Sequence, residues 1–355
     1  MGYRLDFKKM KLTETGGIYV RSFPAADQII IDSKIIKKPG FLANDVFVQS
    51  LIPEEHSVLV KKNNYYDYSK TIAVEQKEVT KLENILLFKK DILFSLTDGI
   101  QVSSNKIQSP FISRDKYIIK NNNLYFSSIT QNATLTAAQK TTPVLKKMVA
   151  FSMQGNNIIW LATDGFIYKS DVSGTVTTTA KITKLPIKTV KSGTYKIIND
   201  DKNIFLNNNG NLLLLNSKTN ILENFYSPVK DASIAQSQDG ANIVYYNDNE
   251  IYISKIPTAD LPILKRNILY KSLDKISNCV WLNSSYVIFT AGNKILISEI
   301  DYRGKINSIT LPQTIVISPT QTVNIVNPQI FFEQQTGKLY ILTGKTLLAS
   351  EKLTK

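Results

Sequence analysis

VAFSMQGNNIIWLATDGFIYKSD, residues 149–171, is the stretch that decides the fold of this chain. It reads as a strand, a polar Gly-Asn-Asn turn, a second strand rich in large apolar residues, an Asp-Gly turn and a third strand. Similar successions of strand and turn lie at 111–127, 195–215, 233–255, 279–298 and 323–342. The pattern predicts a series of small antiparallel sheets.

The copies begin near residues 108, 147, 190, 232, 278 and 322. Their spacing of roughly 40–45 residues is the length of a four-stranded propeller blade. One such sheet cannot bury both of its faces, so the sheets are expected to pack in a ring that hides their edges. We therefore predict a six-bladed β-propeller over residues 89–355. Residues 91–106 either pair with the last blade and close the ring, or form a seventh, shorter blade.

The first ninety residues show a different spacing of strands. Alternating or apolar runs, separated by Gly, Pro and Asn, lie at 17–23, 28–34, 57–62, 70–75 and 78–88, with a turn at Lys38-Pro39-Gly40. Five or six short strands at this spacing predict a small antiparallel β-sandwich over residues 16–88. The whole chain is thus expected to be all-β.

Ordered features of residues 16–88 resemble the PEGA domain family. They are a Gly-Gly strand at 16–20, FPAAD at 23–27, IIID at 29–32, KPGF at 38–41, LIPEEHSV at 51–58, NYYDY at 64–68 and a closing strand. Ser33, Glu55 and Asn64 stand where the family has Gly. Asn is the best substitute because it tolerates a positive φ, whereas Ser33 and Glu55 imply altered turns.

The repeats of residues 91–355 resemble degenerate bacterial surface propellers, without the Gly-His and Trp-Asp signature of the WD repeat. PEGA domains occur beside such propellers in anchored envelope proteins. The combined resemblance implies an extracytoplasmic protein of the bacterial cell surface. Residues 1–15 contain aromatic and basic residues typical of a membrane-exit zone, and we interpret them as a juxtamembrane-like lead segment that follows an N-terminal transmembrane helix.

The residue inventory restricts the chemistry. The chain has one histidine, His56, and one cysteine, Cys279. An intrachain disulfide and a multi-histidine metal site are therefore excluded, and a Ser-His-Asp arrangement could only use His56. The sequence has no GxGxxG, P-loop, GxSxG or His-Glu-x-x-His motif. We predict no catalytic, cofactor-binding or metal-binding residues, no cofactor, and no enzymatic activity.

Several polar and aromatic groups have both a structural and a functional interpretation. His56, at the start of a strand, is expected to pack or hydrogen-bond. Tyr65, Tyr66 and Tyr68 are expected to pack in the core and at its rim, although exposed tyrosines can stack on sugars. The Asp-Gly pairs at 98–99, 164–165 and 239–240 are interpreted as turns and not as ion-binding loops. The Asn runs at 121–123 and 207–209 are interpreted as hairpin tips, although Asn also suits sugar binding.

The formal charge of +14, from 43 Lys and Arg against 29 Asp and Glu, raises the question of an anionic partner. Arginine occurs only at positions 4, 21, 114, 266 and 303. Nucleic acid is an unlikely partner because its recognition favours the bidentate guanidinium. A Lys-rich solvated surface explains the charge, and attraction to an anionic envelope polymer or membrane surface is the alternative.

These patterns favour a non-catalytic envelope scaffold. One propeller face would bind a protein or a glycan, and the PEGA-like domain would act as a membrane-proximal spacer. One alternative is a propeller-type glycosidase or lyase, which would need two facing carboxylates about 5–10 Å apart. Another is a structural envelope protein that assembles with copies of itself.

Overall fold

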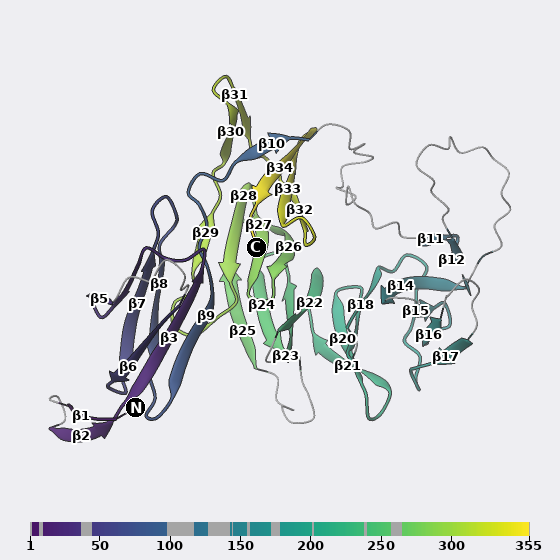
Figure 1. Cartoon of the computed structure of the whole chain (residues 1–355). Coiled ribbons are helices and arrows are strands. Elements are labelled where there is room, and N and C mark those ends of the chain that lie inside the picture. Colours follow the sequence, from purple (N-terminus) through teal and green to yellow (C-terminus); the bar gives the residue numbers. More distant parts are fainter. Residues whose placement is uncertain are drawn as a thin grey trace. The chain divides into compact units, whose positions relative to one another are not determined.

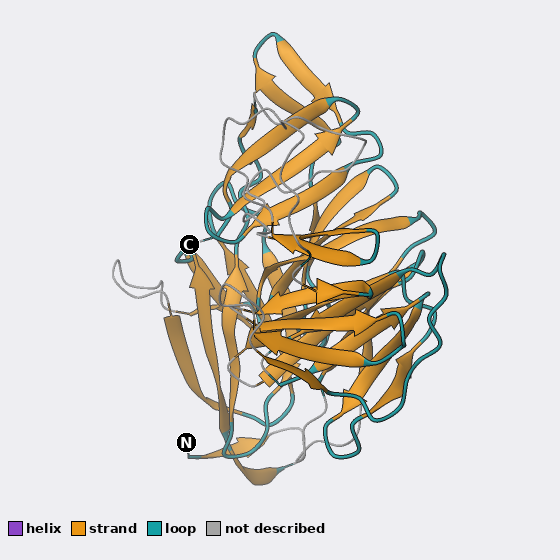
Figure 2. Ribbon diagram, turned by 90° about the vertical axis from the view of Figure 1, so that its right-hand side faces the viewer, coloured by secondary structure: helices purple, strands orange, loops and turns teal. Residues whose placement is uncertain are grey.

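The computed structural model describes residues 2–6, 10–36, 45–97, 117–126, 143, 145–154, 157–171, 178–200, 202–237, 240–256 and 265–354. Within these ranges every regular element is a β-strand and no helix occurs, as Figure 2 shows. It follows that this part of the chain contains no helix that could cross a membrane. The predicted all-β class is confirmed.

The chain, whose strands are labelled in Figure 1, divides into two compact units. Unit 1 combines residues 1–100 with 280–355, and unit 2 comprises residues 101–279. The segment predicted as a sandwich therefore belongs to the same unit as the last sheets of the chain. The domain boundaries proposed from sequence, at 1–15, 16–88 and 89–355, stay predictions.

The N-terminal part of unit 1 is a hairpin followed by two facing sheets. The hairpin pairs β1 (Tyr3–Asp6) with β2 (Lys11–Glu14). The first sheet has the order β6-β3-β9 and the second the order β5-β4-β7-β8. Their strands are β3 (Gly16–Phe23), β4 (Gln28–Ile31), β5 (Lys34–Ile36), β6 (Asp45–Leu51), β7 (Glu55–Lys61), β8 (Tyr68–Ala73) and β9 (Val79–Leu86). Both sheets contribute to one apolar core, with Ile18 and Leu82 from the first and Ile29 and Val60 from the second.

The two sheets of residues 16–86 differ from the predicted sandwich in one pairing. The expectation of an antiparallel sandwich is wrong for β3 and β9, which run parallel from Gly17↔Val79 to Phe23↔Leu86. The pairs β3–β6, β4–β5, β4–β7 and β7–β8 are antiparallel. An alternating pattern determines which side chains face inward, but it carries no information on the direction of the neighbouring strand.

Turn chemistry explains how these strands are joined. Asp32 and Ser33 connect β4 to β5 with φ of 48° and 63°, the geometry of a two-residue hairpin turn with positive φ at both positions. Ser33 therefore keeps the left-handed backbone that Gly favours. Asn64 has φ of 63°, as its place in the family pattern predicts, and Glu55 is the first residue of β7. The predicted turn at Lys38-Pro39-Gly40 lies outside the described residues.

The C-terminal part of unit 1 consists of two four-stranded sheets and a hairpin. One sheet has the order β26-β27-β28-β29, and its first strand crosses the boundary between the units. The other has the order β10-β34-β33-β32, and β30 pairs with β31. The strands are β10 (Phe94–Leu96), β26 (Ile276–Asn283), β27 (Tyr286–Ala291), β28 (Lys294–Glu299), β29 (Ser308–Thr310), β30 (Thr314–Ser318), β31 (Gln321–Asn324), β32 (Gln329–Glu333), β33 (Lys338–Thr343) and β34 (Thr346–Lys352).

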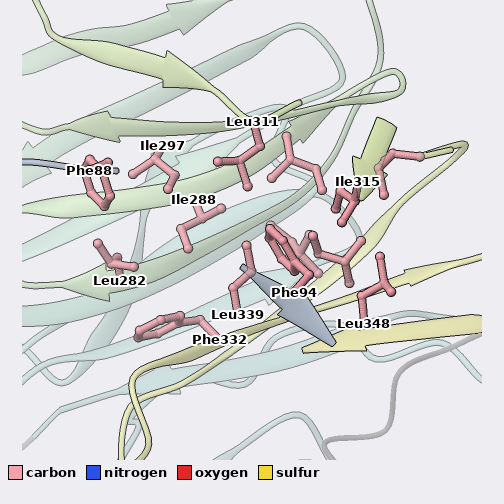
Figure 3. Packing of buried hydrophobic residues seen from close by; sticks show 14 of the residues in the cluster. Phe88, Phe94, Leu282, Ile288, Ile297, Leu311, Ile315, Phe332, Leu339 and Leu348 are labelled. Carbon is pink, nitrogen blue, oxygen red and sulfur yellow. The ribbon is translucent and has the colours of Figure 1, made fainter. Parts of the chain in front are cut away.

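A shared apolar core joins these two sheets. Leu282, Ile288 and Ile297 come from the first sheet and face Phe332, Leu339 and Leu348 of the second (Figure 3). Phe94 enters this core from β10, which pairs with β34 through Phe94↔Ser350 and Leu96↔Leu348. Of the two alternatives for residues 91–106, pairing with the last sheet is observed for residues 94–96. Closure of a ring stays a prediction, and residues 98–106 lie outside the described residues.

Unit 2 repeats one sheet design along the chain. Three four-stranded antiparallel sheets have the orders β14-β15-β16-β17, β18-β19-β20-β21 and β22-β23-β24-β25, and a three-stranded sheet β11-β12-β13 precedes them. The strands are β11 (Tyr117–Lys120), β12 (Asn123–Phe126), β13 (Leu145–Lys146), β14 (Met148–Gln154), β15 (Asn157–Ala162), β16 (Ile167–Asp171), β17 (Thr178–Lys181), β18 (Tyr195–Asn199), β19 (Ile204–Asn208), β20 (Asn211–Asn216), β21 (Ile221–Tyr226), β22 (Asp231–Ser237), β23 (Gly240–Tyr246), β24 (Glu250–Lys255) and β25 (Arg266–Lys271).

Each sheet of unit 2 packs on the next one along the chain. Leu124 of β12 shares a cluster with Ile158 of β15, and Leu161 of β15 shares another with Leu206 of β19. Phe205 of β19 in turn packs with Tyr245 of β23. Four-stranded sheets stacked through both faces are the packing expected of propeller blades. The predicted blade number, six or seven, stays a prediction.

Candidate functional site

His56, the single histidine, is a buried structural residue in β7. Its Nδ1 lies 2.6 Å from Asp32 Oδ2, and its Nε2 lies 2.7 Å from the carbonyl oxygen of Ile52. Both neighbours are hydrogen-bond acceptors, so each can be the partner of a ring N–H group. Asp32 Oδ1 also accepts from the backbone N–H of Ser57 at 3.0 Å. The histidine therefore ties the β4–β5 turn to β7, in agreement with the structural interpretation.

The three clustered tyrosines occupy three different environments. Tyr68 is buried, and its hydroxyl donates to Glu299 Oε2 at 3.0 Å. Burial and the nearby Glu299 carboxylate raise the pKa of this phenol. Tyr66 packs against the core of the C-terminal sheets, and Tyr65 packs at the edge of the sandwich core, with Lys62 Nζ 5.7 Å from its ring centre. The predicted core and rim packing is confirmed.

Asp164-Gly165 and the Asn positions at 121–122 and 209 form turns. Asp164 accepts from the N–H of Phe166 at 3.0 Å and from the Tyr168 hydroxyl at 2.9 Å, while Gly165 has φ of 87°. A Cβ on Gly165 would lie 2.0 Å from the Ile187 carbonyl oxygen, so this close approach requires glycine. Residues 121–122 and 209–210 form hairpin tips with positive φ, as predicted. Gly240 has φ of 115°, whereas Asp98, Gly99 and Asp239 lie outside the described residues.

Cys279 is buried in β26, and burial followed by the charge of Asp231 raises the pKa of its thiol. A buried thiol with a raised pKa is a poor nucleophile. Among the residues that the structure describes, no three His, Cys, Asp or Glu side chains gather where they could hold a metal ion.

A buried ion pair joins the sandwich to the C-terminal sheets. Lys70 of β8 places its Nζ 2.6 Å from Glu299 Oε1 and 2.7 Å from the Asp301 carbonyl oxygen, and both side chains are at most 5% exposed. The Asn307 backbone and side-chain amides each donate to Glu299 Oε1 at 2.8 Å. Every oxygen of this carboxylate is thus occupied, and the cluster has a structural role.

Sequence reasoning missed this ion pair because its members are 229 residues apart. In β8, Tyr68, Lys70 and Ile72 alternate with partly or largely exposed residues, so Lys70 occupies an inward-facing position. A charged residue at an inward-facing position of an alternating strand was the sequence signal that could have revealed a buried ion pair.

An aromatic pocket, which we define by its lining, lies in unit 1. Its volume is about 380 Å³, within the range of small-ligand sites. The apolar lining residues are Phe23, Pro24, Tyr65, Leu87, Phe88, Ile92 and Leu353. The polar ones are Lys89, Glu351, Lys352 and Thr354. Of the three tyrosines considered from sequence, only Tyr65 lines this pocket.

Of the three charged residues that line the aromatic pocket, Lys89 and Glu351 pair with each other. Lys89 Nζ donates to Glu351 Oε2 at 2.6 Å, and this hydrogen bond raises the pKa of the lysine. Glu351 Oε1 accepts from the backbone N–H of Leu93 at 3.1 Å. Glu351 is the one carboxylate in the lining, and both of its oxygens are engaged. The pocket therefore offers aromatic and aliphatic surface together with the Lys352 side chain.

A second, polar hollow of about 470 Å³ lies beside the edges of β8 and β9. Its lining includes two carboxylates, Glu55 and Glu78, and two cations, Lys81 and Arg303. Arg303 donates to the Lys81 carbonyl oxygen at 2.9 Å, and Gly304 approaches the Thr71 carbonyl oxygen so closely that a Cβ would clash. These contacts block part of both strand edges.

No family model matches the chain, and no curated protein matches it. Solved β-propeller structures resemble it at low identity. The Cps50 (Swd1) β-propeller domain of Myceliophteria thermophila is 11% identical over 56% of this chain and 62% of that one, with a TM-score of 0.39. Kluyveromyces lactis Hsv2 is 12% identical over 66% of this chain and 67% of that one, with a TM-score of 0.41.

A third similar structure is the extracellular domain of a hybrid two-component system from B. thetaiotaomicron. It is 12% identical over 94% of this chain, with a TM-score of 0.40. The present chain spans 62% of the length of the Cps50 domain and 39% of the length of the extracellular domain.

Proposed function

We propose that this chain is a non-catalytic interaction protein of the cell envelope and that it holds a protein or glycan partner in the aromatic pocket. The observation that carries the proposal is the lining of that pocket. It combines Phe23, Tyr65 and Phe88 with aliphatic side chains, and its single carboxylate is engaged by Lys89 and Leu93. Aromatic surface in a preformed hollow suits recognition of an apolar side chain or a sugar face.

The binding site of this proposal differs from the one favoured by the sequence pattern, which was a broad propeller face. The aromatic pocket forms where β3 ends, where the 87–92 connection runs and where β34 ends. In this proposal residues 16–88 act as a PEGA-like, membrane-proximal module. The Lys70–Glu299 pair and the bond from the Leu86 N–H to the Tyr286 hydroxyl at 3.0 Å would transmit its position to residues 280–355.

A pocket variant tests the binding site. Tyr65→Ala combined with Ile92→Ala removes partly buried lining and spares the buried Leu87 and Phe88. The matched control is Tyr302→Ala combined with Val316→Ala, two exposed residues of unit 1 outside the pocket. Purified wild type and variants would be titrated against immobilised envelope polysaccharides and envelope proteins. We expect the pocket variant to lose about tenfold in affinity, or more, and the control to keep it. Equal affinities for all three would contradict the assignment.

A turnover assay tests the non-catalytic part. Purified protein would be incubated with envelope polysaccharides, and new reducing ends or unsaturated products would be measured. We expect no product above background. Product formation in proportion to the protein concentration would favour the glycosidase or lyase alternative, and Glu55→Gln and Glu78→Gln in the polar hollow would then be the first variants to assay.

The envelope location has its own test. The protein would be followed in fractionated cells and by protease treatment of intact cells. We expect recovery with the membrane fraction and cleavage from outside. Recovery in the soluble cytoplasmic fraction would contradict an envelope role and leave the pocket assignment standing.

A further inference from the structure

The β1–β2 hairpin presents an exposed apolar face. Leu5 of β1 pairs directly with Leu12 of β2, so their side chains lie on the same side of the ribbon. Tyr3 shares this side because it is two residues from Leu5, and Met10 immediately precedes β2. The four side chains are between 42% and 78% exposed. Exposed large apolar residues gathered on one small element indicate a contact surface.

The opposite side of the hairpin is polar and directed toward the sandwich. Arg4 pairs with Thr13 on this side, and Lys11 shares it because it is two residues from Thr13 in β2. The Arg4 guanidinium donates to the Ser50 carbonyl oxygen in β6 at 3.2 Å. At the base of the hairpin, Gly2 and Thr15 exchange backbone and side-chain hydrogen bonds of 2.8–3.0 Å. These contacts hold the hairpin at the end of the β6-β3-β9 sheet, as Figure 1 shows.

The exposed face changes from polar to apolar along its length. At its base the Tyr3 hydroxyl donates to Glu14 Oε1 at 3.0 Å, and Lys77 Nζ lies 2.9 Å from the same oxygen. Farther out lie Leu5, Leu12 and Met10. A tyrosine with its hydroxyl in a polar layer and its ring beside aliphatic groups is typical of the boundary between water and lipid.

The size of this face argues against a second protein as its occupant. A ribbon of two four-residue strands is about 13 Å long and about 5 Å between strands, far smaller than the roughly 800 Å² per partner of a stable interface. A lipid bilayer, in contrast, can accept a small apolar surface without a shape that is complementary to it. Residues 3–14 contain four basic and two acidic side chains, and the whole chain carries +14, so anionic lipids would also be attracted.

We propose that the β1–β2 hairpin binds the surface of an anionic lipid bilayer, with Leu5, Met10 and Leu12 in the interface and the Tyr3–Glu14–Lys77 cluster at headgroup level. This site is separate from the aromatic pocket. Its test therefore succeeds or fails independently of what that pocket binds.

Vesicle co-sedimentation tests the proposal. The purified chain would be mixed with vesicles of phosphatidylcholine alone, and with vesicles of equal parts phosphatidylcholine and phosphatidylglycerol. We expect binding to the anionic vesicles and much less to the neutral ones. Leu5→Ser combined with Leu12→Ser should lower the partition coefficient at least about tenfold, because two aliphatic side chains no longer enter the interface. Lys11→Gln should lower it about fivefold on anionic vesicles only.

The matched control is Leu185→Ser combined with Leu273→Ser, two exposed leucines of unit 2. It should bind like wild type. An environment-sensitive fluorophore on Leu12→Cys should shift to the blue with anionic vesicles, and the same label on Leu273→Cys should not. Cys279 is buried and does not compete for the label.

Three results would overturn the proposal. The first is no binding of wild type to anionic vesicles, and the second is equal loss of binding in the hairpin and control variants. The third is a concentration-dependent dimer in lipid-free solution that the Leu5→Ser, Leu12→Ser variant abolishes, which would assign the face to a second copy of the chain.

Discussion

At the scale of single residues, the charged groups that matter most to the fold are those that the structure hides. Lys70 and Glu299 form a pair whose members are fully and almost fully buried, and Tyr68 and Asn307 complete the shell of Glu299. Charges taken out of water are tolerated because each finds several partners in a fixed geometry. Removing one member leaves the other buried without compensation.

Lys70→Met is expected to destabilise unit 1 by about 3–5 kcal/mol, because it leaves the Glu299 carboxylate buried without its cation. Lys89→Met is the control. The Lys89–Glu351 pair has the same 2.6 Å separation but is 45% and 26% exposed, so its loss should cost less than about 1 kcal/mol. Urea unfolding followed by fluorescence measures both. Similar costs for the two variants would contradict a special role for the buried pair.

The pH dependence of stability should include a contribution from Asp301. Partial burial alone would raise its pKa, but the hydrogen bond from Arg303 and the charges of Lys70 and Arg303 outweigh this effect and lower it. A lowered pKa in the folded state stabilises the fold above the unfolded value near 3.9, and this stabilisation disappears as the pH falls through the folded pKa. Unfolding free energies between about pH 6 and 2 should therefore fall less steeply in Asp301→Asn. An unchanged slope would refute this assignment.

At the scale of elements, turns and closing strands decide how the sheets are completed. The three residues of β10 supply the outer strand of a sheet whose other members lie more than 230 residues later. The side chain of Phe94 packs in the shared core and so anchors β10, whereas Leu96 remains 40% exposed. A strand this short contributes through its buried side chain more than through its backbone.

Phe94→Ala should destabilise unit 1 by about 3 kcal/mol because it leaves a cavity between the two C-terminal sheets. Leu96→Ala, in the same strand, should cost no more than about 0.5 kcal/mol. Hydrogen exchange of the β34 amides provides a second readout, and it should accelerate in Phe94→Ala alone. If both substitutions cost the same, β10 is not anchored by Phe94.

At the scale of the whole molecule, the net charge of +14 is distributed and its effects should depend on salt. Interactions of exposed lysines with a distant anionic surface are screened over about 8 Å at physiological ionic strength. The binding of a partner that the aromatic pocket recognises by its shape should depend much less on the salt concentration. Binding through exposed lysines and binding in the aromatic pocket are therefore expected to respond differently to the salt concentration.

Binding to a soluble polyanion such as polyglutamate should fall steeply between low salt and about 0.3 M salt, since exposed charges are screened. Pocket-dependent binding, defined as the part lost in Tyr65→Ala with Ile92→Ala, should change by less than about threefold over the same range. Titrations at several salt concentrations measure both. A pocket-dependent component that vanishes together with polyanion binding would show that the pocket acts through charge.

The sequence by itself determined the strand-rich class, several turns of the described residues and the scarcity of reactive side chains. Local signals sufficed, because an alternating strand pattern and turn residues such as Asn64, Gly165 and Asn209 act within a few positions. The one histidine was correctly interpreted as structural for the same reason, since its position in a strand indicated packing.

Only the tertiary structure decided the parallel pairing of β3 with β9, the partner of Lys70 and the location of the aromatic pocket. Each depends on which distant segments meet: the pocket combines residues from 23, 65, 87–92 and 351–354. The periodicity of a strand specifies its buried face but not the strand or side chain that covers it. Contacts between distant segments are fixed by the packing of the whole unit, and no local pattern encodes them.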